Sequence, residues 1–337
     1  MILKQTHTMI LYHIIGVLLL ASVWCQACPS GCTCRDATAD CYGKLPRMSQ
    51  FQQQTIDISI HDVETDEIPE NTFADLKNRN RINLYNMKIR KIKYGAFKNI
   101  ENIKGINLYS STIGTIETNA FTDIRNLSVL SIYSTNITTI EPYAFNRIRD
   151  LGRFAIYDVK IDSIKTQAFA NFYRLNLFTI YSSSLDLIQN NTFYKFLNIK
   201  KITFYDNTVG ELQCNSLDIL KKLNGSDVNY YSNRLTCDCK LSWFVHAVIE
   251  NPRRYGNDDG NVCNAPQKYK NRGLVSVALE ISSCPGQKQA CPSVTDLEGK
   301  RDTDNSANVG DNGGSSADSL FNLQPFLITS LLVITFL

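Results

Sequence analysis

The chain has 337 residues, with 35 Lys and Arg against 32 Asp and Glu and a formal net charge of +3. This near balance excludes the strong basic field that is typical of nucleic-acid-binding proteins. The sequence also lacks a P-loop, an HExxH motif and a Gly-x-Gly-x-x-Gly motif after an expected strand. We therefore expect no catalytic site, no cofactor, no metal and no nucleic-acid partner.

The segment 1–27 has the pattern of a secretory signal peptide. Lys4 and His7 precede an apolar run over positions 9–24, which ends at the small-x-small sequence Cys25-Gln26-Ala27. The alternative is a retained transmembrane anchor, which the interruptions in the apolar run and the cysteine cluster that follows disfavour. We expect cleavage after Ala27 and an extracellular, oxidising environment for the mature chain.

Ten of the 11 cysteines remain after the leader, and an even number in a secreted chain indicates disulfides. Eight of them form two clusters, Cys28, Cys32, Cys34 and Cys41 in front and Cys237, Cys239, Cys263 and Cys284 behind. A zinc site is the competing interpretation, and the oxidising compartment disfavours it. The sequence leaves open whether Cys214 and Cys291 pair with each other or stay free.

A 24-residue repeat lies between the two clusters. Its markers are phenylalanines at one constant interval, Phe73, Phe97, Phe121, Phe145, Phe169 and Phe193. An apolar pair with one residue between its members recurs in seven copies, from Ile58 and Ile60 to Ile202 and Phe204, and a second pair follows six of these copies. Such a pair points to one side of a strand, and one copy cannot cover its own apolar face, so the copies must stack.

This period and pattern are typical of leucine-rich repeats. We expect about seven copies over residues 55–232 in an α/β, right-handed solenoid. Short parallel strands should line its concave face, and its convex side should be irregular or short-helical.

A tyrosine directly follows six of the strand pairs, and His61 takes this place in the first copy. The tyrosines are Tyr85, Tyr109, Tyr133, Tyr157, Tyr181 and Tyr205. Strand alternation directs this column away from the core, onto the concave face. The rings either stack and shield the sheet or form a binding surface, since tyrosine is enriched at interface hot spots. The two interpretations are compatible, and we predict that the stripe contacts a protein partner.

The cysteine clusters flank the repeats where caps are needed. Here the chain resembles the extracellular leucine-rich-repeat family, over residues 28 to 284. Cys28-x3-Cys32-x-Cys34-x6-Cys41 is similar to the amino-terminal cap, for which we assign residues 28–54. The run from Asn233 to Phe244, with Cys263 and Cys284, is similar to the carboxy-terminal cap, for which we assign residues 233–291.

The resemblance implies four disulfides, Cys28–Cys34, Cys32–Cys41, Cys237–Cys263 and Cys239–Cys284. A helix packed on the last repeat is indicated by the spacing of Leu241, Phe244, Val245, Val248 and Ile249. The chain departs from the family in the column that usually carries an asparagine, which reads Met87, Ser111, Thr135, Val159, Ser183 and Asn207. We therefore predict a thinned ladder of side-chain-to-backbone hydrogen bonds.

Four sequons predict N-glycosylation at Asn126, Asn136, Asn190 and Asn224. Residues 292–319 form a polar linker, because their composition cannot bury enough apolar surface to fold. Residues 320–337 are mostly apolar, and their uninterrupted part is too short for a bilayer span of about 20 residues. This pattern is typical of glycolipid (GPI) attachment, with Asn312 as the preferred site and Gly313 and Ser315 as rivals. The alternative is a poor transmembrane helix.

The sequence thus favours a cell-surface recognition or adhesion protein on the outer face of the plasma membrane. It resembles the GPI-anchored adhesion and co-receptor members of the family, which implies a protein ligand or co-receptor bound through the concave face. Homophilic pairing is left open. The second hypothesis is a secreted immune-recognition protein or a non-catalytic accessory subunit.

Overall fold

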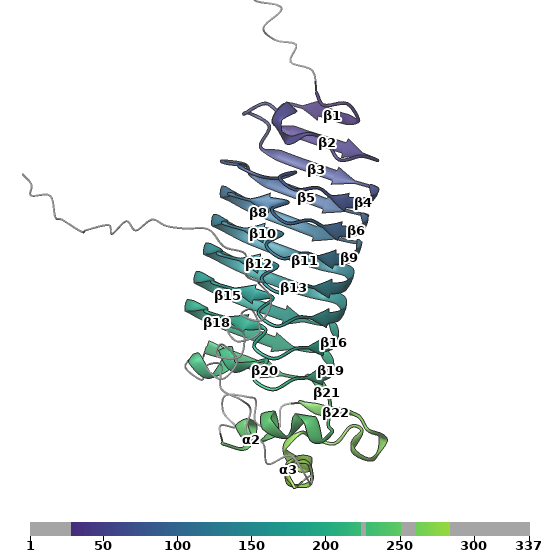
Figure 1. Cartoon of the computed structure of the whole chain (residues 1–337), viewed down its shortest axis with the longest axis vertical. Helices are drawn as coiled ribbons and strands as arrows, with labels where there is room; N and C mark the ends of the chain where they lie inside the picture. The colour runs from purple at the N-terminus through teal and green to yellow at the C-terminus, as the bar shows by residue number, and fades with distance from the viewer. Residues whose placement is uncertain (1–27, 224–226, 251–259, 284–337) are drawn as a thin grey trace, which may run out of the picture. The chain divides into compact units, whose positions relative to one another are not determined.

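The computed structural model describes residues 28–223, 227–250 and 260–283. In these residues the chain coils through eight stacked turns, and each turn pairs in parallel with the turn before it (Figure 1). The first side of the turns consists of the strands β3 (Asp57–His61), β5 (Arg81–Tyr85), β8 (Glu101–Tyr109), β11 (Arg125–Ile140), β13 (Arg149–Ile164), β15 (Tyr173–Tyr181), β18 (Leu197–Tyr205) and β20 (Val228–Tyr231).

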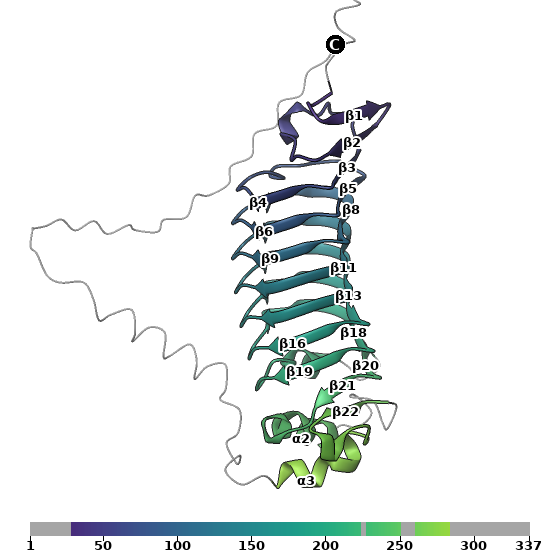
Figure 2. The same cartoon turned by 90° about the vertical axis from the view of Figure 1, so that its right-hand side faces the viewer.

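The second side of the turns is a further line of parallel strands, which Figure 2 shows one above the other. They are β4 (Glu64–Ile68), β6 (Lys88–Ile92), β9 (Thr112–Ile116), β16 (Ser184–Ile188), β19 (Thr208–Leu212) and β21 (Arg234–Thr236), while β11 and β13 run through both sides. A third side carries a separate five-stranded sheet of two-residue strands, β7 (Phe97–Lys98), β10 (Phe121–Thr122), β12 (Phe145–Asn146), β14 (Phe169–Ala170) and β17 (Phe193–Tyr194).

The stack of parallel strands with disulfide-bonded ends confirms the predicted solenoid. The strand register repeats the sequence period, since Leu130 pairs with Phe154 and Ile132 with Ile156. The structure adds an eighth turn, β20, which the constant period missed because the step from Tyr205 to Tyr231 is longer than the others. The returning segments are also more regular than expected. In the described residues they hold short strands, and α-helix occurs only in the carboxy-terminal cap.

The core fills the space between the three sides. All seven predicted first apolar pairs are buried, and so are the six second pairs. The six repeat phenylalanines stack on one another with ring centroids 4.3–5.4 Å apart. Burial of each such side chain stabilises the folded chain by about 1.5–3 kcal/mol. Because the rings of successive turns contact each other, the turns share one continuous core.

The corners between the sides are made by residues with left-handed backbone conformation. In one turn these are Ser110, Asn119, Asp123 and Asn126, with φ between +50° and +55°. The equivalent positions of other turns repeat this conformation, mostly with Asn, Asp, Ser or Gly, and Asn and Asp tolerate it better than most residues. Four such corners close the turn and bring the chain back under its own strand without a helix.

The amino-terminal cap is a hairpin joined to the first turn. Strand β1 (Cys32–Arg35) pairs antiparallel with β2 (Thr38–Tyr42), and β2 pairs in parallel with β3. The 3₁₀ segment η1 (Met48–Gln50) follows. Disulfides join Cys28 to Cys34 and Cys32 to Cys41, the two pairs that the family resemblance implies.

The carboxy-terminal cap covers the other end of the core. It contains η4 (Cys239–Leu241), α2 (Ser242–Glu250), β22 (Val262–Ala265), η5 (Gln267–Tyr269), η6 (Val275–Val277) and α3 (Ala278–Ser282), while η2 (Asp218–Lys222) precedes the eighth turn. Of the expected helix positions, only Ile249 is exposed. A disulfide joins Cys237 to Cys263, as the resemblance implies. Cys214 and Cys239 are also disulfide-bonded, whereas Cys284 and Cys291 lie outside the described residues.

A buried ladder of side-chain acceptors connects the turns at the corner after the first side. The Met87 N–H donates to Ser111 Oγ at 3.0 Å, and the ladder continues through hydroxyls to Asn207, Asn233 and Asn261. Val159 offers no acceptor to the turn before it, so the ladder is interrupted there. Hydroxyls in place of amides, together with this gap, confirm the predicted thinning.

The ladder predicts that removing a buried hydroxyl lowers the free energy of unfolding more than removing an exposed one nearby. Ser111→Ala leaves the buried Met87 N–H without its acceptor, and we expect the free energy of unfolding to fall by about 1–3 kcal/mol. Chemical denaturation measures this change. Thr112→Ala, at the exposed next residue, is the control and should stay within about 0.5 kcal/mol of the original chain. Equal effects of the two substitutions would show that the ladder adds no stability.

Candidate interaction surface

The structure brings the six predicted tyrosines together in one column at the end of the first-side strands. Neighbouring rings have centroids 4.7–5.0 Å apart, and their planes differ by 2–13°. This spacing matches the distance of about 4.8 Å between adjacent strands. The pitch of the sheet therefore sets the spacing of the rings, and the rings stack face to face.

The stack extends beyond the six tyrosines at both ends, to His61, which the sequence places in this column, and to Tyr231, which it does not. His61 stacks on Tyr85 at 4.7 Å, and Tyr231 stacks on Tyr205 at 5.2 Å, which gives a run of eight rings. Tyr42 of the amino-terminal cap meets His61 edge-on at 5.5 Å. Tyr231 was missed because of its longer step from Tyr205, although it follows the apolar Val228 and Tyr230 as the pattern requires. We call the first-side surface around this stack the tyrosine face.

The stack presents ring edges and hydroxyl groups outward. The flat faces of the rings contact each other, so a partner meets the electropositive ring edges. The outward column two residues before the tyrosines is covered as well, since Ser131, Ala155, Thr179 and Thr203 are only 1–8% exposed. Beside the middle and later rings of the stack, the tyrosine face is therefore filled in this column by small side chains.

Partial burial keeps the phenol groups protonated. Desolvation raises the pKa of Tyr85, Tyr109, Tyr133, Tyr157 and Tyr205 above the ordinary value of 10.0. Neighbouring phenols also raise the pKa of these tyrosines except Tyr109, and at Tyr157 the charge of Asp158 raises the pKa while Arg153 lowers it. A phenol is protonated at neutral pH even at its ordinary pKa, so these hydroxyls act as hydrogen-bond donors as well as acceptors, and burial extends this state to higher pH.

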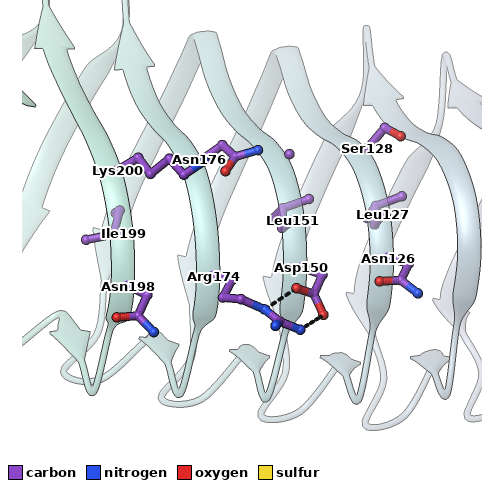
Figure 3. Close-up of a pocket in the computed structure, with 11 residues that line it drawn as sticks. Asn126, Leu127, Ser128, Asp150, Leu151, Arg174, Asn176, Asn198, Ile199 and Lys200 are labelled. Carbon is purple, nitrogen blue, oxygen red and sulfur yellow. Dashed lines mark hydrogen bonds and ion pairs between the residues drawn. The ribbon is translucent and has the colours of Figure 1, made fainter.

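A second surface feature is a polar hollow near the start of the first-side strands, with a volume of about 660 Å³ (Figure 3). Asp150 and Arg174 form an ion pair along one edge, with Arg174 Nη2 2.7 Å from Asp150 Oδ2. Gly152 also lines it, and a Cβ there would meet the Ser128 carbonyl oxygen at 2.5 Å. The sequon residue Asn126 stands at its rim. Sequence analysis did not predict this hollow.

The remaining predicted site residues lie away from the tyrosine face or outside the described residues. Asn126 and Asn136 are exposed, whereas Asn190 is half-buried beside the fully buried Thr192. Asn224 and Asn312 lie outside the described residues. Within the part of the chain that the structure describes, no cluster of three or more His, Cys, Asp or Glu could hold a metal. None of the helices described there has the length and apolar character for a membrane span.

Comparison with known proteins identifies the repeat. The sequence model of the family described as "BspA type Leucine rich repeat region" matches in six copies, over residues 48–176 and 138–242. None of the curated proteins matches the chain.

Among solved structures, human 5T4 (Wnt-activated inhibitory factor 1, trophoblast glycoprotein) is 17% identical with a TM-score of 0.43, over 77% of this chain and 99% of that chain. A chain of the octameric complex of Latrophilin 3, Unc5D and FLRT2 is 12% identical with a TM-score of 0.27, over 77% and 100%.

The raised phenol pKa values predict loss of stability at alkaline pH. The unfolded chain releases these protons first, so the contribution is full below pH 10.0 and is lost as the pH rises through the folded-state values. Titration of tyrosinate absorbance should show a late phase, and Tyr133→Phe with Tyr157→Phe should reduce that phase. Reduction of the early phase near pH 10.0 instead would contradict the burial of these groups.

Proposed function

Because the chain belongs to the BspA-type leucine-rich-repeat family, we propose that it is an extracellular recognition protein that binds a protein partner through the tyrosine face. The observation that carries this proposal is the uninterrupted stack of eight rings from His61 to Tyr231. Tyrosine supplies large contact area and hydrogen bonds at low conformational cost. Stacking restricts the rings further, so the side chains lose little conformational entropy when a partner binds.

The extracellular assignment is supported by the disulfides at both ends of the repeats. Two of the predicted glycosylation sites also leave the tyrosine face accessible. Asn126 lies seven residues before Tyr133 in β11, about 23 Å along the strand. Asn136 lies beyond the corner at Ser134, on the second side. Glycans at these two positions would project from the flanks of the tyrosine face.

Membrane attachment is the second part of the proposal. We place the chain on the outer cell surface through a glycolipid at Asn312, a residue outside the described ones. The support is the composition of the sequence after residue 291, a polar linker with small residues followed by an apolar tail. The competing hypothesis, a secreted recognition or accessory subunit, shares the tyrosine face and differs only in attachment.

Replacement of tyrosines in the stack should abolish partner binding. Tyr133→Ser, Tyr157→Ser and Tyr181→Ser together remove the middle of the stack, and we expect secretion to persist because these side chains lie outside the core. A pull-down from surface-labelled cells measures binding. The matched control replaces Tyr94, Tyr173 and Tyr194 with Ser, three tyrosines away from the stack, and should bind normally. Unchanged binding by the stack variant would reject the proposal.

Phosphatidylinositol-specific phospholipase should release the protein from intact cells if the glycolipid assignment is right. The readout is the amount of protein in the medium before and after treatment. Asn312→Gln combined with Gly313→Gln and Ser315→Gln removes the preferred site and its rivals, and should abolish lipase-sensitive surface display. Protein that accumulates in the medium without lipase would favour the secreted alternative.

A further inference from the structure

In two of the turns, the ring stack has a basic residue on one flank and an acidic residue on the other. Four positions before the tyrosine, on the same face, the fifth and seventh turns carry Arg153 and Lys201. One position after the tyrosine, at the corner, the same two turns carry Asp158 and Asp206. All four residues are exposed. The tyrosine face thus has a basic edge and an acidic edge in these turns.

Three of the turns carry neither charge. In the third, fourth and sixth turns the first position holds Gly105, Val129 and Leu177, and the corner position holds Ser110, Ser134 and Ser182. The second turn pairs Arg81 with the neutral Asn86. Cation and acid therefore occur together in the fifth and seventh turns and are both absent from the three uncharged ones.

These charges do not satisfy each other within the chain. Arg153 and Asp158 lie five residues apart on β13, about 16 Å in an extended strand, which is too far for an ion pair. In the described residues neither Arg153 nor Lys201 forms an ion pair, and the acids bond only to serine hydroxyls, Ser134 to Asp158 and Ser182 to Asp206. The cations are available to a partner, and each acid keeps a free oxygen.

We propose that the partner of the tyrosine face is a second copy of this chain, related by a two-fold axis parallel to the stack. This inference rests on the proposed function and names its partner. Such an axis places each turn opposite its own equivalent and exchanges the two edges, so Arg153 of each copy meets Asp158 of the other, and Lys201 meets Asp206. The interface is self-complementary, as a two-fold requires.

The pitch of the stack supports the same partner. The rings repeat every 4.7–5.0 Å, and a second stack of the same chain has the same pitch, so contacts stay in step over all turns. An α-helix rises about 5.4 Å per turn and drifts out of step. Two sheets packed face to face lie about 10 Å apart, a gap that tyrosine and arginine side chains from both copies can fill.

Charge also selects the direction of the pair. A two-fold axis along the strands would keep each edge opposite itself and reverse the turn order, which sets Lys201 against Arg81. The parallel axis avoids this repulsion and places both carboxy-terminal caps at the same end, so the two copies pair on one membrane. In the first turn Asp57 and Asp62 are both acidic, with Asn80 and His61 as their own partners, so the contact centres on the third to seventh turns.

The test uses two full-length chains with different tags, expressed in the same cells, and measures how much of one is captured with the other. Arg153→Asp with Lys201→Asp makes both edges acidic, and Asp158→Arg with Asp206→Lys makes both edges basic. We expect each variant to lose self-capture at least ten-fold. When the two variants are expressed together, each edge again meets its opposite, and capture should return. Lys91→Asp with Lys160→Asp, at exposed positions on the second side, is the control and should have no effect.

Two results would overturn the inference. Self-capture that survives both charge variants would place the pair elsewhere on the molecule. Absence of self-capture in the original chain, with tyrosine-dependent capture of another surface protein retained, would reject the second copy and leave the proposed function standing. Loss of both kinds of capture would reject the inference and the proposed function together.

Discussion

The parallel register between turns is the constraint on which the rest of the structure depends. Each residue pairs with its equivalent one period later, so a residue type that recurs in the repeat lies beside copies of itself, as Tyr133 does beside Tyr157. Identical neighbours suit phenylalanine inside and tyrosine outside, because both rings stack at the strand spacing. One backbone pairing thus produces the continuous core and the ordered surface at the same time. It also makes each turn depend on its neighbours for burial of its apolar side chains. At the two ends of the stack, the disulfide-bonded caps take the place of the missing neighbour.

The same register imposes the same backbone requirement on the corners of every turn. A residue in left-handed conformation is needed at the same place in every turn, and the chain meets this mostly with Asn, Asp, Ser and Gly. The buried N–H groups beside the first corner need acceptors, which serines, Thr135 and three asparagines supply. Polar residues at the corners are therefore chosen by the backbone first. Their placement beside the ring stack then gives the tyrosine face its acidic edge.

Much of the fold and of the candidate surface could be predicted because periodicity exposes them directly. The apolar pairs and the phenylalanine column repeat without error over six or seven copies, and strand alternation alone places the tyrosines outside. The eighth turn was missed because a short insertion before Tyr231 breaks the period. The short strands of the third side were missed because they are too short to show alternation. Corners filled by Tyr143, Arg147 or Lys195 carry no compositional signal for a left-handed backbone. The burial of Ala155 and Thr179 depends on the conformations of neighbouring side chains, which the spacing of residues in the sequence does not predict.

The central claim is that the tyrosine face is covered by another protein at the cell surface. Hydroxyl-radical footprinting of the full chain tests this directly, by comparing intact cells with the same protein extracted and diluted until it is monomeric. The account predicts that Tyr133, Tyr157 and Tyr181 are protected on cells, whereas Tyr94 and Tyr173, exposed away from the stack, label equally in both states. Equal labelling of the stacked tyrosines in the two states, or protection of Tyr94 and Tyr173 instead, would contradict it.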